Sequence, residues 1–93
     1  MRFKNLSNEI KDLIPGYLEN RSKEIKLLSN LLSDCNLIDI NKIGHKLAGN
    51  AGSYGLDELG KIGERLEFAT NLTDIPQVLL DYKRLLQSYE DSL

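Results

Sequence analysis

Apolar residues recur at every third or fourth position through most of the chain, which is the spacing of one face of an α-helix. One long series runs from Ile14 to Cys35, and another runs from Ile75 to Leu93. No stretch alternates between apolar and polar residues in the way that a half-buried strand does. The pattern therefore predicts an all-α protein.

Proline, glycine and polar capping residues indicate where the helices begin and end. A short first helix is expected over residues 6–13, because Pro15 is best tolerated at the start of the next helix, which would run to Asp34. Asn36, with Asp39 three positions later, predicts the start of a third helix. Gly55 is expected to be the left-handed residue that ends it.

A fourth helix is expected over residues 56–69, and a fifth begins at Asp74, with Gln77 completing a capping box. Short connections between consecutive amphipathic helices favour antiparallel neighbours. We therefore expect residues 1–93 to form one domain, an up-down antiparallel four-helix bundle with a short additional N-terminal helix.

Composition narrows the classes of function. The net charge of −2 does not favour a nucleic-acid partner, for which a basic domain is usual. No apolar run approaches the roughly 18 residues of a membrane span, and the polar start has no signal-peptide core. We therefore expect a cytoplasmic protein with no membrane partner. The single cysteine, Cys35, excludes an internal disulfide and is expected to be buried from its helical phase.

The only histidine, His45, is expected to project outward from the third helix. The apolar residues that mark the buried side lie about 160–180° away from it on a helical wheel, and they are Ile43, Leu47 and Tyr54. The face that carries His45 also holds three small residues, each within about 60° of it, and they are Ala48, Gly49 and Gly52. The helix surface around the imidazole is therefore almost bare of side chains.

Glycine inside a helix is less favourable than alanine by about 0.8–1 kcal/mol, so Gly49 and Gly52 together lower stability by roughly 2 kcal/mol. Because both lie away from the apolar stripe, the simplest reason for them is a large partner that approaches the imidazole. Gly44 and Gly63 are instead expected to be packing glycines, which let neighbouring helices come close.

Several chemistries lack the residues that they need. The single histidine would have to activate Cys35, which lies on a different helical phase, so nucleophilic thiol catalysis is not expected. One histidine and one cysteine cannot supply three or four zinc ligands. No glycine-rich loop follows a strand, so an ATP site is not expected either. Paired carboxylates such as Glu64 and Glu67 are typical of solvated helix faces.

The segment His45–Leu56, followed by Leu59 and then Leu66-Glu67, resembles the signature of histidine-containing phosphotransfer (HPt) domains of two-component phosphorelays. In that family a leucine, a glycine, a small residue and a glycine stand two, four, six and ten positions after the histidine. This chain has the corresponding residues Leu47, Gly49, Ala51 and Gly55. Helix count and total length agree as well. Many members carry a lysine three positions after the histidine, where this chain has Ala48.

The resemblance implies a phosphocarrier and not an enzyme. His45 would accept a phosphoryl group from the aspartyl phosphate of one receiver domain and pass it to the aspartate of another. The partners would be a response-regulator receiver domain and a hybrid histidine kinase. Because the receiver would bring Mg²⁺, this chain would need no cofactor or metal of its own.

The resemblance also assigns roles to the residues around the histidine. Lys42 and Lys46 would stabilise the added negative charge in place of the lysine that is absent at Ala48. Ala48, Gly49 and Gly52 would form the docking face for the receiver.

Two other functions fit the same residues. A non-catalytic adaptor would bind or sequester a receiver or kinase domain through the same helix face, with His45 incidental. A purely structural bundle, such as a dimerisation module, would need a large apolar patch away from His45. The sequence shows one apolar stripe per helix and no surplus, so we expect a monomer.

Overall fold

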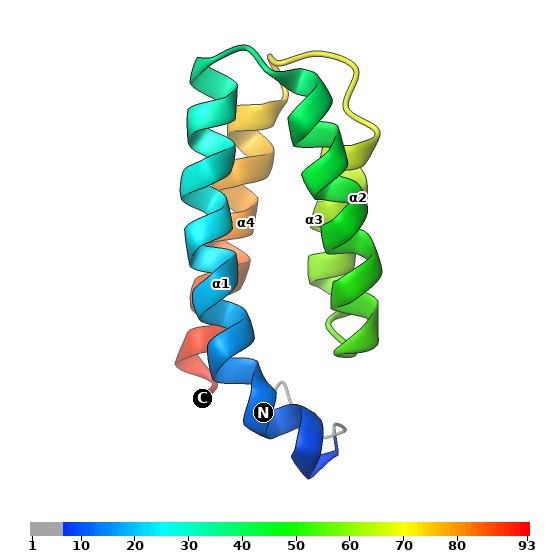
Figure 1. The fold of residues 1–93 in the computed structure, drawn as a ribbon. Coiled ribbons are helices and arrows are strands. Elements are labelled where there is room, and N and C mark those ends of the chain that lie inside the picture. The colour runs from blue at the N-terminus through cyan, green and yellow to red at the C-terminus, as the bar shows by residue number, and fades with distance from the viewer. Residues whose placement is uncertain (1–6) are drawn as a thin grey trace.

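The computed structural model describes residues 7–93, which form four α-helices and no strand. The helices are α1 (Asn8–Ser33), α2 (Leu37–Ser53), α3 (Asp57–Glu67) and α4 (Ile75–Asp91). Figure 1 shows that they run alternately up and down, and that the start of α1 and the end of α4 lie at the same end of the molecule. An all-α, four-helix architecture is therefore confirmed.

The prediction of a separate short helix before Pro15 is wrong over the residues that the structure describes. Residues 8–13 are the first turns of α1, which continues through Pro15, while Leu6 lies outside the described residues. Proline removes one main-chain hydrogen bond, but Ile14 and Leu18 on either side are almost fully buried, and this burial keeps the helix continuous. Figure 1 shows the first turns of α1 leaning away from the rest, a bend for which proline is the usual cause.

The turn between α1 and α2 corrects the prediction for Cys35. The amide of Cys35 donates to the carbonyl of Leu32, and the amide of Asn36 donates to that of Leu31, which together form a Schellman motif. Cys35 takes the left-handed position of that motif (φ 55°), where glycine is usual. Because α1 has already ended, its helical phase no longer applies, and the thiol is exposed instead of buried.

The other predicted helix ends have mixed outcomes. Asn36 caps α2 as expected, since its side-chain oxygen accepts from the amide of Asp39 (3.1 Å). Gly55 is confirmed as the left-handed residue after α2 (φ 71°). The prediction of a capping box at the start of α4 is wrong. Asp74 makes no side-chain cap bond, and the side chain of Gln77 donates to the carboxylate of Asp81, one turn further along α4.

A single apolar core lies between the four helices. Its fully buried members come from every helix, and the largest are Tyr82, Ile14, Leu18, Leu28, Ile40, Leu47, Leu59, Leu66 and Ile75. Burying each such side chain stabilises the fold by about 1.5–3 kcal/mol. Among the helices of residues 7–93, none combines the length and the apolar content that crossing a membrane requires.

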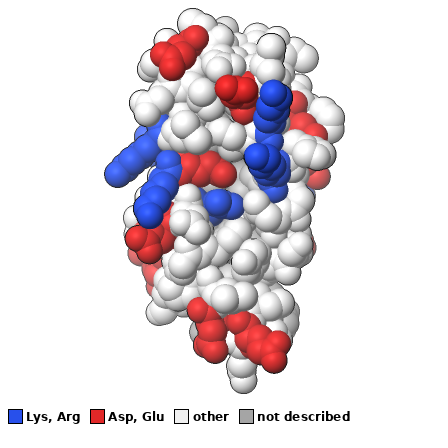
Figure 2. Space-filling view, in the orientation of Figure 1, with Lys and Arg blue, Asp and Glu red and all other residues white. Residues whose placement is uncertain are grey.

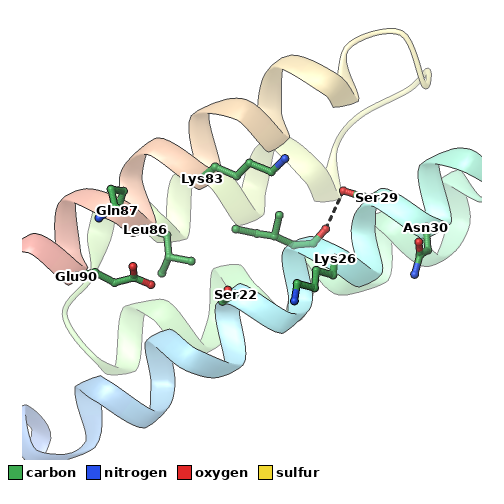
Figure 3. A pocket seen from close by; sticks show the side chains of 9 residues that line it. Ser22, Lys26, Ser29, Asn30, Lys83, Leu86, Gln87 and Glu90 are labelled. Carbon is green, nitrogen blue, oxygen red and sulfur yellow. Dashed lines mark hydrogen bonds between the residues drawn. The ribbon is translucent and has the colours of Figure 1, made fainter.

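The helix pair α1 and α4 leaves an open groove of about 640 Å³ between its members. Its floor is formed by the buried side chains of Ile25 and Leu86. Figure 3 shows polar side chains from both helices along its edges, and these are Ser22, Lys26, Ser29, Asn30, Lys83, Gln87 and Glu90. The groove lies along a seam between helices that includes neither α2 nor α3.

Candidate functional site

Helices α2 and α3 contact each other through their main chains at two glycines. A Cβ atom on Gly63 would lie 2.4 Å from the main-chain nitrogen of Ala48, and one on Gly44 would lie 2.4 Å from that of Glu67. Both distances are far inside van der Waals contact, so only glycine fits at these positions. The prediction that Gly44 and Gly63 are packing glycines is confirmed.

This close approach places Glu67 of α3 beside His45 of α2. The distance from His45 Nδ1 to Glu67 Oε2 is 2.5 Å. The imidazole side chain is 76% exposed and the carboxylate only 24% exposed, so the ring projects from the bundle while its partner is largely covered. Gly44 directly precedes His45 and Gly63 lies one turn before Glu67, so the glycine contact sets the spacing that this pair needs.

The hydrogen bond to Glu67 distinguishes the two ring nitrogens of His45. A carboxylate oxygen can only accept, so the ring proton lies on Nδ1, which donates to Glu67. In the neutral ring, Nε2 then keeps its lone pair, and the ring that carries it is exposed. Such an imidazole can act as a nucleophile or accept a hydrogen bond from a partner. Across residues 7–93, no group of three or more His, Cys, Asp and Glu side chains could hold a metal ion.

The small residues of α2 fall into two groups. Gly49 and Gly52 are exposed, and a Cβ atom on either would meet no other atom within 4 Å, so neither glycine serves helix packing. Ala48 differs from the prediction, because it is half-buried and its main chain packs against Gly63 of α3. On the helical wheel Ala48 lies on the side of His45 that faces α3. Of the predicted docking residues, only the two glycines lie on the open surface.

Both predicted lysines lie beside the imidazole. Lys42 Nζ is 4.0 Å from Asp39 Oδ1, but both side chains are largely exposed, so this ion pair is weak. Within residues 7–93, Lys46 makes no ion pair and is exposed. A concave surface of about 520 Å³ brings both lysines together with His45, and its lining residues are Asn41, Lys42, His45, Lys46, Glu67 and Phe68.

Sequence reasoning missed three residues of this concave surface, namely Asn41, Glu67 as the partner of His45, and Phe68. The Phe68 side chain is 72% exposed. It directly follows α3 and lies outside the apolar phase of that helix, which was the available signal. Ile38, at the start of α2, is 69% exposed. The expectation of one apolar stripe per helix with no surplus is therefore wrong.

The opposite side of α2 is held by a polar network from α1. Asn50 accepts hydrogen bonds from the hydroxyl of Tyr17 and from Arg21 (3.3 Å), whose guanidinium also lies 3.7 Å from Glu24. Tyr82 of α4 donates to Glu24 (2.8 Å). Burial raises the pKa of Glu24, although the Tyr82 hydroxyl and the Arg21 guanidinium both act to lower it.

Charges of both signs lie across the face formed by α1 and α2, as Figure 2 shows, with acidic and basic side chains next to one another. No single sign of charge covers this face. The positive character beside His45 is therefore local, and it comes from Lys42 and Lys46.

Comparisons with known proteins do not add to this geometry. No protein-family model matches the chain, and no curated protein and no solved structure matches it. The functional argument therefore depends on the residues of the site.

Proposed function

We propose that the protein is a phosphorelay phosphocarrier of the HPt type, which receives a phosphoryl group on His45 from one receiver domain and passes it to another. The observation that supports this proposal is the exposed imidazole, whose Nδ1 donates to Glu67 and whose Nε2 has no hydrogen-bond partner among residues 7–93. Its partners would be a response-regulator receiver domain and a hybrid histidine kinase, in the cytoplasm. The resemblance of the segment from His45 to Leu56 to the HPt signature points the same way.

The proposed transfer needs no proton to move. The lone pair of His45 Nε2 attacks the phosphorus of the aspartyl phosphate, and an N–P bond forms as the P–O bond to the aspartyl oxygen breaks. The electron pair of that bond leaves with the receiver's carboxylate. The phosphorylated ring becomes positive while Nδ1 keeps its hydrogen, and the adjacent carboxylate of Glu67 stabilises that charge. Transfer to the second receiver is the reverse of these steps.

The surroundings of the ring fit a partner that is a folded domain. Gly49 and Gly52 leave open space beside His45, which lets the receiver bring its phosphoryl group in line with Nε2. Lys42 and Lys46 attract the phosphoryl charge over a distance, since both are exposed and only Lys42 has an ion pair within residues 7–93, a weak one. The metal ion of the reaction would come with the receiver.

The test is phosphate transfer from isolated receiver domains that have been phosphorylated in the presence of Mg²⁺. We expect the parent protein to gain acid-labile, alkali-stable phosphate and the His45→Gln variant to gain none. Glu67→Gln keeps an oxygen that can accept from Nδ1 but removes the negative charge, so transfer should slow by about tenfold or more.

Two results would contradict the phosphocarrier. The first is a parent protein that gains no phosphate from any receiver of the source organism. The second is a His45→Gln variant that is phosphorylated as fast as the parent. Receiver binding that survives His45→Gln, without any phosphate on the chain, would instead favour the adaptor.

A further inference from the structure

The most exposed large apolar side chain in residues 7–93 lies beside the candidate phosphoacceptor. Phe68 is 72% exposed, and it lines the same concave surface as His45. Exposed aromatic rings that become buried on association are frequent anchors of protein interfaces. Phe68 is neither a buried core residue nor one of the apolar residues packed against the core, so packing within the chain does not explain why a phenylalanine stands at this position.

The main chain around Phe68 is held in place by α2. The side-chain amide of Asn41 donates to the carbonyl of Leu66 (2.7 Å) and to the carbonyl of Ala69 (3.2 Å). These two carbonyls bracket Phe68, whose own amide donates to Glu64 (2.9 Å). Asn41 lies one turn before His45 on the same helix. The aromatic ring and the imidazole are therefore presented together from one rigid frame, so a partner can contact both without reordering the chain.

The charges around the ring indicate what kind of surface would cover it. Lys42 and Lys46 line the same concave surface, while the carboxylate of Glu67 is already occupied by His45. A partner with carboxylates around an apolar cleft would complement this arrangement. A second copy of the chain fits poorly, because a symmetric contact through Phe68 would bring the lysines of both copies together and cover His45.

We propose that Phe68 anchors the phosphotransfer partner by inserting into an apolar cleft of the receiver domain, with acidic residues of that domain paired to Lys42 and Lys46. This inference rests on the proposed function and makes Phe68 a determinant of partner affinity and specificity. Phe68 itself takes no part in the transfer of the phosphoryl group. Removing its ring should therefore slow transfer from a protein donor and leave the chemical reactivity of His45 unchanged.

The experiment compares Phe68→Ala with Leu27→Ala, a matched loss of an exposed apolar side chain on α1. Each variant is phosphorylated on His45 by two donors, a panel of phosphorylated receiver domains and the small molecule phosphoramidate. With the receiver that reacts fastest with the parent, kcat/KM should fall about tenfold or more for Phe68→Ala and less than about twofold for Leu27→Ala. With phosphoramidate, all three proteins should react at the same rate, and circular dichroism checks separately that the variants are folded.

Each remaining outcome has a definite meaning. Equal transfer from the receiver by Phe68→Ala and the parent would overturn the anchor and leave the proposed function intact. An equal loss with phosphoramidate would show that Phe68 acts on His45 itself, and this would overturn the anchor as well. A parent dimer in sedimentation that Phe68→Ala dissociates would assign the ring to a second copy. A parent protein that takes phosphate from no receiver would overturn the proposed function, and the anchor with it.

Discussion

Helices α2 and α3 contact each other through their main chains at Gly44 and Gly63, whereas α1 and α4 are held apart by side chains around a groove of about 640 Å³. The close pair carries His45, Glu67 and Phe68, while the open pair supplies none of the residues around the imidazole. Main-chain contact leaves two helices little freedom to slide, whereas a groove lined by long side chains can adjust. The relative position of two helices is therefore most tightly fixed at the α2–α3 pair, which positions the candidate site.

The largest effect on stability should come from adding one methyl group at the contact between α2 and α3. Gly63→Ala would place a Cβ atom 2.4 Å from the main-chain nitrogen of Ala48, so the helices must separate. We expect the free energy of unfolding to fall by about 2–3 kcal/mol, even after the gain in helix propensity. The measurement is urea denaturation followed by circular dichroism.

The matched control for this variant is Gly60→Ala, on the same helix and three residues earlier. A Cβ atom on Gly60 would meet its nearest neighbour, the carbonyl oxygen of Ala48, at 3.7 Å, which is ordinary contact. This control should be as stable as the parent or more stable. Equal stability of Gly63→Ala and Gly60→Ala would show that α2 and α3 do not depend on main-chain contact.

A smaller change in stability, of opposite sign, is expected for a substitution on the open surface of α2. Gly49 has nothing within 4 Å of its Cβ position, so Gly49→Ala should raise the free energy of unfolding by about 0.8–1 kcal/mol through helix propensity alone. Thermal or urea denaturation beside the parent measures the gain. A loss of stability would mean that this surface of α2 contacts the rest of the chain.

The groove between α1 and α4 should tolerate added volume that the close pair rejects. Ser22→Leu introduces a large side chain at the edge of the groove, above Ile25 and Leu86. Leucine is also the better helix former, so we expect a rise of roughly 0.5 kcal/mol in the free energy of unfolding. Urea denaturation is the test, and a fall of more than about 1 kcal/mol would show that the groove is as tightly packed as the α2–α3 contact.

The smallest effect concerns the hydrogen bond from Tyr82 of α4 to Glu24 of α1. Burial raises the pKa of Glu24 above its usual 4.5, so the folded protein keeps this proton to higher pH than the unfolded chain does. By linkage, the free energy of unfolding falls as pH rises from the unfolded pKa through the folded pKa. Glu24→Gln cannot titrate, so its stability relative to the parent should increase over that same interval.

Urea denaturation of both proteins at pH values from about 4 to about 7 measures this difference. The glutamine side chain still offers an oxygen to the Tyr82 hydroxyl, so the hydrogen bond between α1 and α4 can persist. A stability difference that stays constant with pH would show that Glu24 is as well solvated in the folded protein as in the unfolded chain.

The sequence predicted those features that follow from the position of a residue on its own helix. Periodicity identified the four long helices and the outward direction of His45, and the phase of Gly44 and Gly63 marked them as packing residues. Features that depend on where a helix ends, or on which side chains are buried around it, were missed. Whether α1 continues past Pro15 depends on how the flanking side chains are buried, and the exposure of Cys35 depends on where that helix ends.

The missing part of the candidate site has the same explanation. The sequence places Glu67 on a solvated helix face, because only the crossing of α2 and α3 brings it to the imidazole. Ala48 appeared to be on the open surface because a helical wheel does not show that α3 covers that side. The role of Asn41 requires the end of α3 to lie beside α2, a tertiary contact that no local pattern encodes.

The two hydrogen bonds of Asn41 have a consequence for engineering the chain. These bonds hold the main chain in place at Leu66 and Ala69. A change in the connection to α4 that follows should therefore not move the aromatic ring of Phe68. Extra residues inserted after Ala69, such as a reporter tag or a grafted peptide, would leave the geometry around the imidazole undisturbed.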